Sequence, residues 1–250
     1  MAFMHTPLTV RIHAPAMTGA DSRPLKMVLG VERALSGTRL EWTVSDAQQL
    51  VRIAQRDTWL GMARSGGGFQ LVCNNDESRP VTLFGVAAPG SLGPGGHALL
   101  EVHAELPLVA SGVALDLMEN IAEAANGYWG HATPFDAAVE ISRQVRDPVR
   151  KPGSPPRGLP ALKLTEHLLS PEIPQHLGWL NYWSDAAARV IGFPDPARDA
   201  ALLSRSRRTP SGGWVVPLTE APLDYDNPEH IEALRRAYER FPVIGGRASP

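Results

Sequence analysis

HALLEVHAEL, residues 97–106, is the stretch of sequence that decides the fold. Apolar side chains alternate with polar ones through it, at Leu100, Val102, Ala104 and Leu106. A period of two residues is typical of a strand in a sheet that has one covered face and one face in water. The sequence therefore predicts a strand over residues 97–106, in a sheet of antiparallel type.

Further strand signals lie on both sides of this stretch. Residues 69–73 and 81–86 are separated by the turn formers Asn74-Asn75-Asp76, which predicts a meander that leads into residues 97–106. Other strands are expected at residues 9–12, 39–44 and 213–218, and Pro217 suggests that the last one lies at a sheet edge.

Capping signals and helical spacing predict the helices. Ser111 precedes the clearest one, whose apolar face is Leu115, Met118, Ile121, Ala122 and Ala125 and which ends at Asn126-Gly127. A capping box at Ser45 and Gln48 predicts a helix towards Trp59, and Pro24 can open an earlier one. A helix from Phe135 to residue 146 is expected to have Phe135, Ala138, Ile141 and Val145 on its apolar face. Helices are also expected over residues 177–191, at residues 200–203, and from Pro228 to Phe241. We therefore predict an α+β fold: an antiparallel meander sheet with helices packed on one face.

Residues 147–160, DPVRKPGSPPRGLP, contain five prolines and two glycines. We interpret them as a surface connection within a single α+β domain over residues 1–250, because a separate unit after them would have few strands and bury little apolar area. A linker between two domains is the alternative.

Composition and charge limit the possible classes of protein. The formal net charge of -2 argues against a partner held by broad phosphate neutralisation, so nucleic acid is not expected as a partner. No stretch approaches the ~20 apolar residues of a membrane span, so no membrane is expected either. Cys73 is the single cysteine, which excludes an intrachain disulfide and a four-cysteine zinc site, and we expect it to be buried in a strand. The N-terminal residues have no continuous apolar stretch after a basic start, so a cytoplasmic location is expected.

The catalytic motifs that sequence can reveal are missing. There is no Gly-x-Ser-x-Gly elbow, no Lys-Ser/Thr after a glycine-rich loop and no His-Glu-x-x-His helix, so no catalytic, cofactor-binding or metal-binding residue is predicted. An enzyme remains the alternative, with a site assembled from the scattered residues His97, His103, His131, Glu166 and His167.

Two charged clusters are candidates for contact with a partner. Asp224 and Asp226 flank Tyr225, either as an acidic contact patch or as turn and capping residues. The basic concentration consists of Arg189, Arg198, Arg205, Arg207 and Arg208 and is partly offset by Asp195 and Asp199. A solvated charged face is its default interpretation, and an acidic protein surface is as plausible a partner as nucleic acid.

Four short segments resemble bacterial immunity families linked to type VI secretion and polymorphic toxins, in particular immunity protein 52 and its relatives. The segments are residues 126–130 (NGYWG), 178–183 (GWLNYW), 213–218 (GWVVPL) and 226–230 (DNPEH), which opens the last helix. The resemblance covers roughly residues 69–241.

This resemblance implies a protein that neutralises a cognate toxin or effector by direct binding, and it carries over no catalytic residue. Tight binding would depend on a few aromatic or arginine anchors. The candidate partner-binding residues are Trp183, Arg205, Arg207, Arg208 and Asp224. The oligomeric state is not predicted.

Overall fold

A computed structural model describes residues 7–62, 67–109, 111–146, 159, 162–163 and 168–245, with the backbone alone at residues 142–146. The predicted proline-rich connection at residues 147–160, apart from Leu159, lies outside the described residues, as do Glu166 and His167 of the enzyme alternative.

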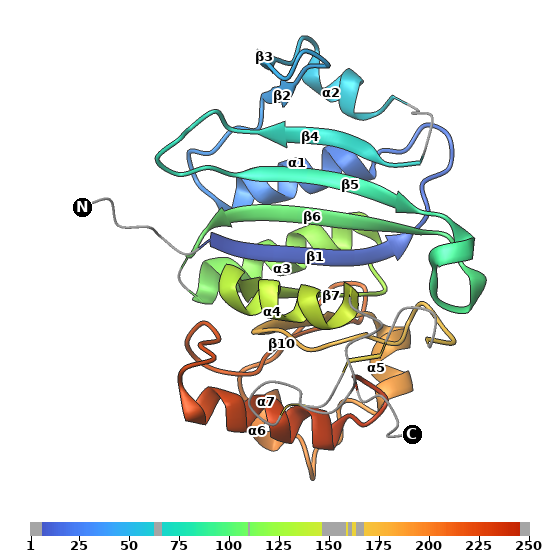
Figure 1. The fold of residues 1–250 in the computed structure, drawn as a ribbon, viewed down its shortest axis with the longest axis vertical. Coiled ribbons are helices and arrows are strands. Elements are labelled where there is room, and N and C mark those ends of the chain that lie inside the picture. Colours follow the sequence, from blue (N-terminus) through green and yellow to red (C-terminus); the bar gives the residue numbers. More distant parts are fainter. Residues whose placement is uncertain are drawn as a thin grey trace.

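Ten strands of the described chain form one antiparallel sheet, in the order β3-β2-β4-β5-β6-β1-β7-β8-β10-β9 (Figure 1). Their bounds are β1 Pro7–Pro15, β2 Trp42–Val44, β3 Leu50–Arg52, β4 Phe69–Cys73, β5 Thr82–Ala88, β6 Leu99–Pro107, β7 Trp129–Pro134, β8 Leu180–Trp183, β9 Arg207–Arg208 and β10 Trp214–Pro217. The predicted meander is β4-β5-β6. The predicted α+β class with an antiparallel sheet is confirmed.

The first strand of the chain lies in the middle of the sheet. β1 pairs with β6 on one side and with β7 on the other, so that Arg11 lies opposite both His103 and His131. Its even-numbered residues are fully buried, whereas Arg11 and His13 on the other face are half-buried. This division gives the sheet an apolar face and a polar face.

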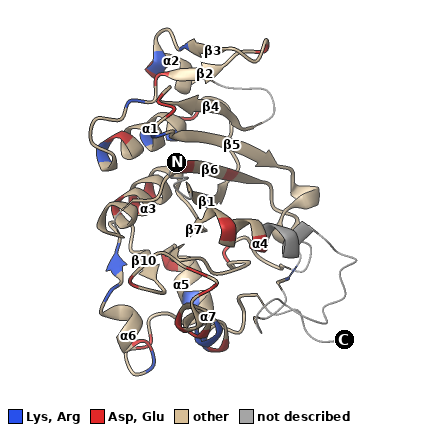
Figure 2. Ribbon diagram, turned by 60° about the vertical axis from the view of Figure 1, so that its left-hand side comes forward, with Lys and Arg blue, Asp and Glu red and all other residues tan. Residues whose placement is uncertain are grey.

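Two helices, α1 (Arg23–Ala34) and α3 (Ser111–Ala125), cover the apolar face of the sheet. They pack against each other, and a Cβ added at Gly30 would lie 3.1 Å from Cβ of Asn120. α3 ends as predicted, with Asn126 at a φ of 54° and Gly127 donating its N–H to the carbonyl oxygen of Ala122. In Figure 2, α1 and α3 lie on one side of the sheet and α4 (Phe135–Arg146) lies on the other.

The remaining helices are short or lie near the edge of the sheet that β10 and β9 form. They are α2 (Arg56–Leu60), α5 (Asp185–Ile191), α6 (Ala200–Leu203) and α7 (Pro228–Arg240), with two 3₁₀ turns, η1 (Gly90–Leu92) and η2 (Pro94–Gly96). Asn227 caps α7 as predicted, because its side chain accepts a hydrogen bond from the N–H of Glu229 (2.9 Å). No described helix is long and apolar enough to cross a membrane.

The helix predicted from Ser45 to Trp59 is wrong. Ser45 and Gln49 close a turn instead, with Gln48 at a φ of 57°, and the chain returns as the β2–β3 hairpin before the short helix α2. The Ser45 hydroxyl does accept a local backbone hydrogen bond, from the N–H of Gln49 (3.3 Å). A side chain of this type caps turns as well as helices, so the signal was ambiguous.

The helix predicted over residues 177–191 is wrong in its first half. Leu180–Trp183 is strand β8, which pairs with β7 and β10, and only Asp185–Ile191 is helical. All four residues of β8 are buried. A short run of residues buried on both faces has no period that distinguishes a strand from a helix.

Pro217 had suggested that its strand lies at an edge of the sheet, but this strand, β10, does not. β10 is the second strand from the edge, but β9 pairs only with Trp214 and Val215. Pro217 therefore lies beyond the end of β9, where its missing N–H breaks no ladder.

Candidate functional site

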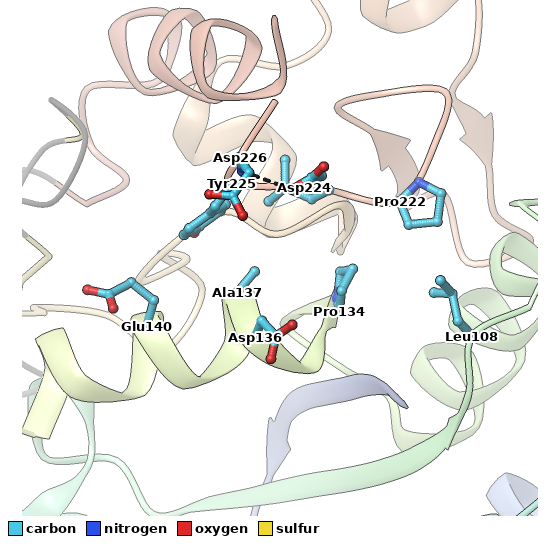
Figure 3. Close-up of a pocket in the computed structure, with 10 residues that line it drawn as sticks. Leu108, Pro134, Asp136, Ala137, Glu140, Pro222, Asp224, Tyr225 and Asp226 are labelled. Carbon is cyan, nitrogen blue, oxygen red and sulfur yellow. Dashed lines mark hydrogen bonds between the residues drawn. The ribbon is translucent and has the colours of Figure 1, made fainter. Parts of the chain in front are cut away.

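An acidic groove opens where β7 passes into α4 (Figure 3). It has a volume of about 440 Å³ and is lined on one side by α4 and on the other by the segment that precedes α7. We call it the acidic groove and define it by its described lining residues: Leu108, Pro134, Asp136, Ala137, Glu140, Pro222, Leu223, Asp224, Tyr225 and Asp226.

The first wall of the groove comes from the start of α4. β7 ends at Pro134 and α4 begins at the next residue, so Asp136 lies in the first helical turn and Glu140 lies one turn further on the same side. An acid in the first turn is favourable because the N-terminal end of a helix is positive. Glu140 gains little from this, and two like charges four residues apart are mildly unfavourable in a helix.

The second wall is a loop with a defined conformation. Leu223 is buried and holds the loop to the core. The backbone N–H of Asp224 donates to Nδ1 of His230 (3.0 Å), and Asp224 Oδ1 accepts from the N–H of Asp226 (2.8 Å) (Figure 3). Part of the role of Asp224 is thus local turn formation, as one interpretation of the sequence expected.

Charge and apolar surface meet in the groove. Of its described lining residues, four are acidic and none is basic. Leu108 is 39% exposed, and Phe135, beside Asp136 in the chain, is 42% exposed. A concave surface with one sign of charge attracts ligands of the opposite sign, and exposed aromatic side chains are typical of protein interfaces.

The exposure of Phe135 corrects the sequence analysis, which placed it on the apolar face of its helix with Ala138 and Ile141. Ala138 and Ile141 are buried as expected. Phe135 is the first residue of α4 and therefore lies before the turns that pack on the sheet. The sequence analysis also did not single out Asp136 and Glu140, because a single acidic pair on a helix carries no sign of what lies opposite.

The five candidate partner-binding residues do not form one surface. Trp183 is fully buried in β8, where its ring packs against Phe193 and Phe241, so it is not accessible to a partner. Large aromatic side chains bury the most apolar area, which favours the core for this residue. Asp224 alone of the five lines the acidic groove.

The arginine candidates lie in or near β9 and are mostly engaged within the chain. Arg205 donates from Nε to the carbonyl oxygen of Pro217 (2.8 Å) and from Nη2 to that of Leu218 (2.7 Å). Arg207 forms ion pairs with Asp116 and Glu119 of α3, and Arg208 is exposed. Of these three arginines, only Arg207 is paired with acids, so the positive charge of the predicted basic face is offset in part.

The histidines of the enzyme alternative are partly brought together. His103 and His131 lie on the polar face of the sheet, whereas His97 is exposed and precedes β6 instead of lying in it. Two histidines that the sequence analysis had not grouped with them join this face. His13 stacks on Trp129, with ring centroids 4.0 Å apart, and His176 meets His131 at 4.3 Å.

The histidine face has the electrostatics of a buried polar layer. Its carboxylate, Glu101, lies 3.5 Å from His103 Nε2 and 4.0 Å from His13 Nδ1, and the hydrogen bond with His103 lowers the pKa of Glu101 to about 2. Burial lowers the pKa of His13 to about 4. Within the part of the chain that the structure describes, no three His, Cys, Asp or Glu side chains are arranged to hold a metal ion.

Fold and site together define an α+β protein with a large open antiparallel sheet and an acidic groove at one helix start. The chain belongs to the family described as Domain of unknown function (DUF5953), which matches residues 19–249.

Among solved structures, the fold is similar to that of the Pseudomonas aeruginosa T6SS protein PA0821, with a TM-score of 0.57 and 15% sequence identity over 97% of this chain and 76% of that one. Identity at this level shows a shared fold. No curated protein matches the chain. Neither the family nor this structure is described as an immunity protein.

Proposed function

We propose that this protein binds and neutralises a cognate bacterial toxin or effector in the cytoplasm, and that the acidic groove contacts a basic part of that partner. The observation that carries the proposal is the meeting of Asp136 and Glu140 of α4 with Asp224 and Asp226 of the facing loop around one concave surface. The fold shared with a type VI secretion protein supports a secretion-related role.

The groove has the components of a charged recognition site. Its carboxylates favour approach of a cationic surface, and Leu108 and Tyr225 supply apolar area beside them. The groove alone is smaller than a standard interface, which buries ~1,600 Å² in total. We therefore expect neighbouring parts of α4 and α7 to complete the contact.

The test is binding to the product of the neighbouring gene, by co-purification and then by calorimetry. We expect a stable complex, and we expect Asp136→Lys to weaken it roughly 10- to 100-fold, which corresponds to about 1.4–2.7 kcal/mol. The affinity of the unaltered protein should also fall as salt is raised, since salt screens exposed charges.

Asp46→Lys is the matched control. Asp46 is an exposed acid in the turn between β2 and β3, near the edge of the sheet that is far from the groove. Its substitution by lysine makes the same change in net charge as Asp136→Lys. The affinity of the Asp46→Lys variant for the partner should stay within about twofold of that of the unaltered protein. Absence of any complex would remove the proposed function. A complex that Asp136→Lys and Asp46→Lys weaken equally would leave the function standing and remove the groove.

A further inference from the structure

Residues 174–179, which we call the strap, cross the polar face of the sheet without regular secondary structure. All six are buried. The N–H of Leu177 donates to the hydroxyl of Tyr238 in α7 (3.0 Å), and the N–H of Gly178 donates to Asn181 Oδ1 (2.9 Å). The strap is also held by hydrogen bonds from Gln175 Nε2 to the carbonyl oxygen of Lys163 (2.8 Å), from Asn181 Nδ2 to that of Gly178 (3.1 Å), from the N–H of Leu218 to that of Trp179 (2.9 Å) and from Trp179 Nε1 to that of Thr219 (3.1 Å). None of its residues belongs to a described strand of the sheet.

Gly178 shows how closely the strap approaches β7. A Cβ added at Gly178 would lie 2.3 Å from Oγ1 of Thr133 and 2.9 Å from Cβ of His131. Only glycine allows the chain to pass at this separation. The strap and β7 thus form a tight interface with no space for a larger group.

Two imidazoles face each other across this interface. His131 of β7 and His176 of the strap are 1% and 5% exposed, with ring centroids 4.3 Å apart at 72°. His131 Nδ1 lies 3.1 Å from the Thr133 hydroxyl. His131 Nε2 and both ring nitrogens of His176 have no hydrogen-bond partner among the residues that the structure describes.

The surrounding charges also disfavour a proton on either ring. Arg11 and His13 of β1 and His103 of β6 face the pair with positive or potentially positive groups. Glu101 of β6 is the acid that opposes them, and it is engaged by His13 and His103.

Among the described residues, the other elements packed here add no charge that would hold a protonated ring. α4 presents the buried side chains Ala137, Ala138 and Ile141, while its acids Asp136 and Glu140 line the acidic groove. α7 presents the neutral phenol of Tyr238, and β8 presents the amide of Asn181, paired with Gly178. Burial accordingly lowers the pKa of His176 to about 3 and that of His131 well below its usual value.

We propose that the strap is a latch that acid releases: protonation of His131 and His176 drives residues 174–179 away from β7 while the rest of the sheet stays folded. Two adjacent cations cannot remain sealed in this interface without a counter-ion, whereas in water each imidazole is charged at little cost. The strap opens before the sheet because its residues lie outside the strand ladders, whereas β5 and β6 are paired along both edges. This inference is independent of the proposed function.

Hydrogen exchange at the amides of Leu177 and Gly178 tests the latch in the full chain. Going from pH 7.5 to pH 5.0, and after correction for intrinsic exchange rates, we expect protection to fall roughly 20- to 30-fold for each imidazole that must be charged. The amides of β5 and β6 should keep their protection. Equal protection of the strap at both pH values, or parallel loss in the strap and in β5 and β6, would overturn the proposal.

Variants assign the effect to the pair. His176→Leu and His131→Leu should each remove about one imidazole's share of the loss, and the double variant should make strap protection nearly independent of pH. His97→Gln, an exposed histidine outside the interface, should leave the loss unchanged. A pH-dependent loss that persists in the double variant would exclude these two groups.

If the double variant does not fold, proton shifts measured on the unaltered protein decide whether the latch exists. Imidazole proton shifts of His131 and His176 should stay those of the neutral ring in the closed form and change only together with the strap amides. If either imidazole becomes charged while the strap stays protected, the latch is excluded.

Discussion

At the scale of single residues, Asp199 differs most from its sequence interpretation. It was expected to offset a solvated arginine face, but it is buried at the start of α6. Its carboxylate accepts from Nε (2.7 Å) and Nη2 (2.9 Å) of Arg240 in α7 and from the N–H of Asp195 (2.7 Å). A bidentate pair of this kind joins two helices that are separated in the chain.

We predict that Asp199→Asn lowers the free energy of unfolding by about 3 kcal/mol, because breaking a buried ion pair leaves its partner without compensation. The estimate lies at the lower end of the usual range since the Arg240 side chain is 20% exposed and can be hydrated. Urea denaturation at neutral pH measures this directly.

Asp185→Asn is the comparison for this prediction. Asp185 forms an exposed ion pair with Arg189 within α5, so its loss should change stability by less than about 1 kcal/mol. If both variants lose the same stability, the Asp199–Arg240 pair has no special role.

At the scale of elements, Glu123 connects α3 to the turn between β9 and β10. Its carboxylate accepts hydrogen bonds from the hydroxyls of Tyr182 (3.1 Å), Thr209 (2.8 Å) and Ser211 (2.6 Å), and from the N–H of Ser211 (3.1 Å). Four donors on one carboxylate fix the position of the turn that carries the arginines of β9.

We predict that Glu123→Gln loosens this turn, because an amide offers one acceptor oxygen and no charge to the four donors. Hydrogen bonds to a charged group are worth about 1.5–3 kcal/mol each, so protection of the Ser211 amide should fall at least about tenfold. Hydrogen exchange resolved by residue is the measurement.

Glu119→Gln provides the control on the same helix. Glu119 pairs with the half-exposed Arg207 (2.8 Å) and does not contact the turn, so Ser211 protection should stay within about twofold. An equal effect of both variants would mean that charge on α3, and not these hydrogen bonds, orders the turn.

The elements that the sequence predicted correctly are those with local signals. α3 has its spacing and its Asn126-Gly127 stop, and α7 has its Asn227 cap; both depend on residues within the helix or directly beside it. β8 and the strap lack such a signal. Their conformation depends on β7, β10 and α7, which the chain brings together only in the folded state.

The candidate site shows the same division. The sequence analysis singled out Asp224 and Asp226 because they share a short loop, but it had no means to pair them with Asp136 and Glu140. That meeting requires β7 to lie beside β1, with α4 folded back over the polar face. His131 and His176 were likewise not paired from the sequence, since only the packing of the strap on β7 makes them neighbours.

At the scale of the whole molecule, the buried histidines predict its response to acid. The pKa values of His13, His131 and His176 are all lowered by burial, to about 4 for His13 and about 3 for His176. The folded state then binds fewer protons than the unfolded state, in which histidine titrates near ~6.5. Their contribution to stability is complete above that pH and is lost as the pH falls below it.

Glu101 acts in a separate window of pH. Its pKa is lowered to about 2, so its contribution is present above the usual range of a glutamate and is lost as the pH falls towards 2. Loss of stability between pH 6.5 and 5 should therefore come from the histidines and not from this carboxylate.

We predict that the free energy of unfolding is nearly constant above pH ~7 and then falls by about 1.4 kcal/mol per pH unit for each buried histidine, or about 4 kcal/mol per unit for three. Urea denaturation at intervals from pH 8 to pH 5 measures this slope. In the double variant His131→Leu/His176→Leu the slope should be about one third as steep. A flat curve between pH 7 and 5 would contradict the prediction.

The slope also connects the whole molecule to its latch. While the strap is closed, His131 and His176 gain their protons only when the chain unfolds, so both contribute to the slope. Once the strap has opened, both are already charged in the folded protein, and His13 alone of the three still gains a proton on unfolding. The curve should therefore bend from a steep to a shallow slope as the pH falls, and the bend should coincide with the pH at which the Leu177 and Gly178 amides lose protection. A steep slope that continues below that pH would show that the two histidines remain sealed after the strap amides are exposed.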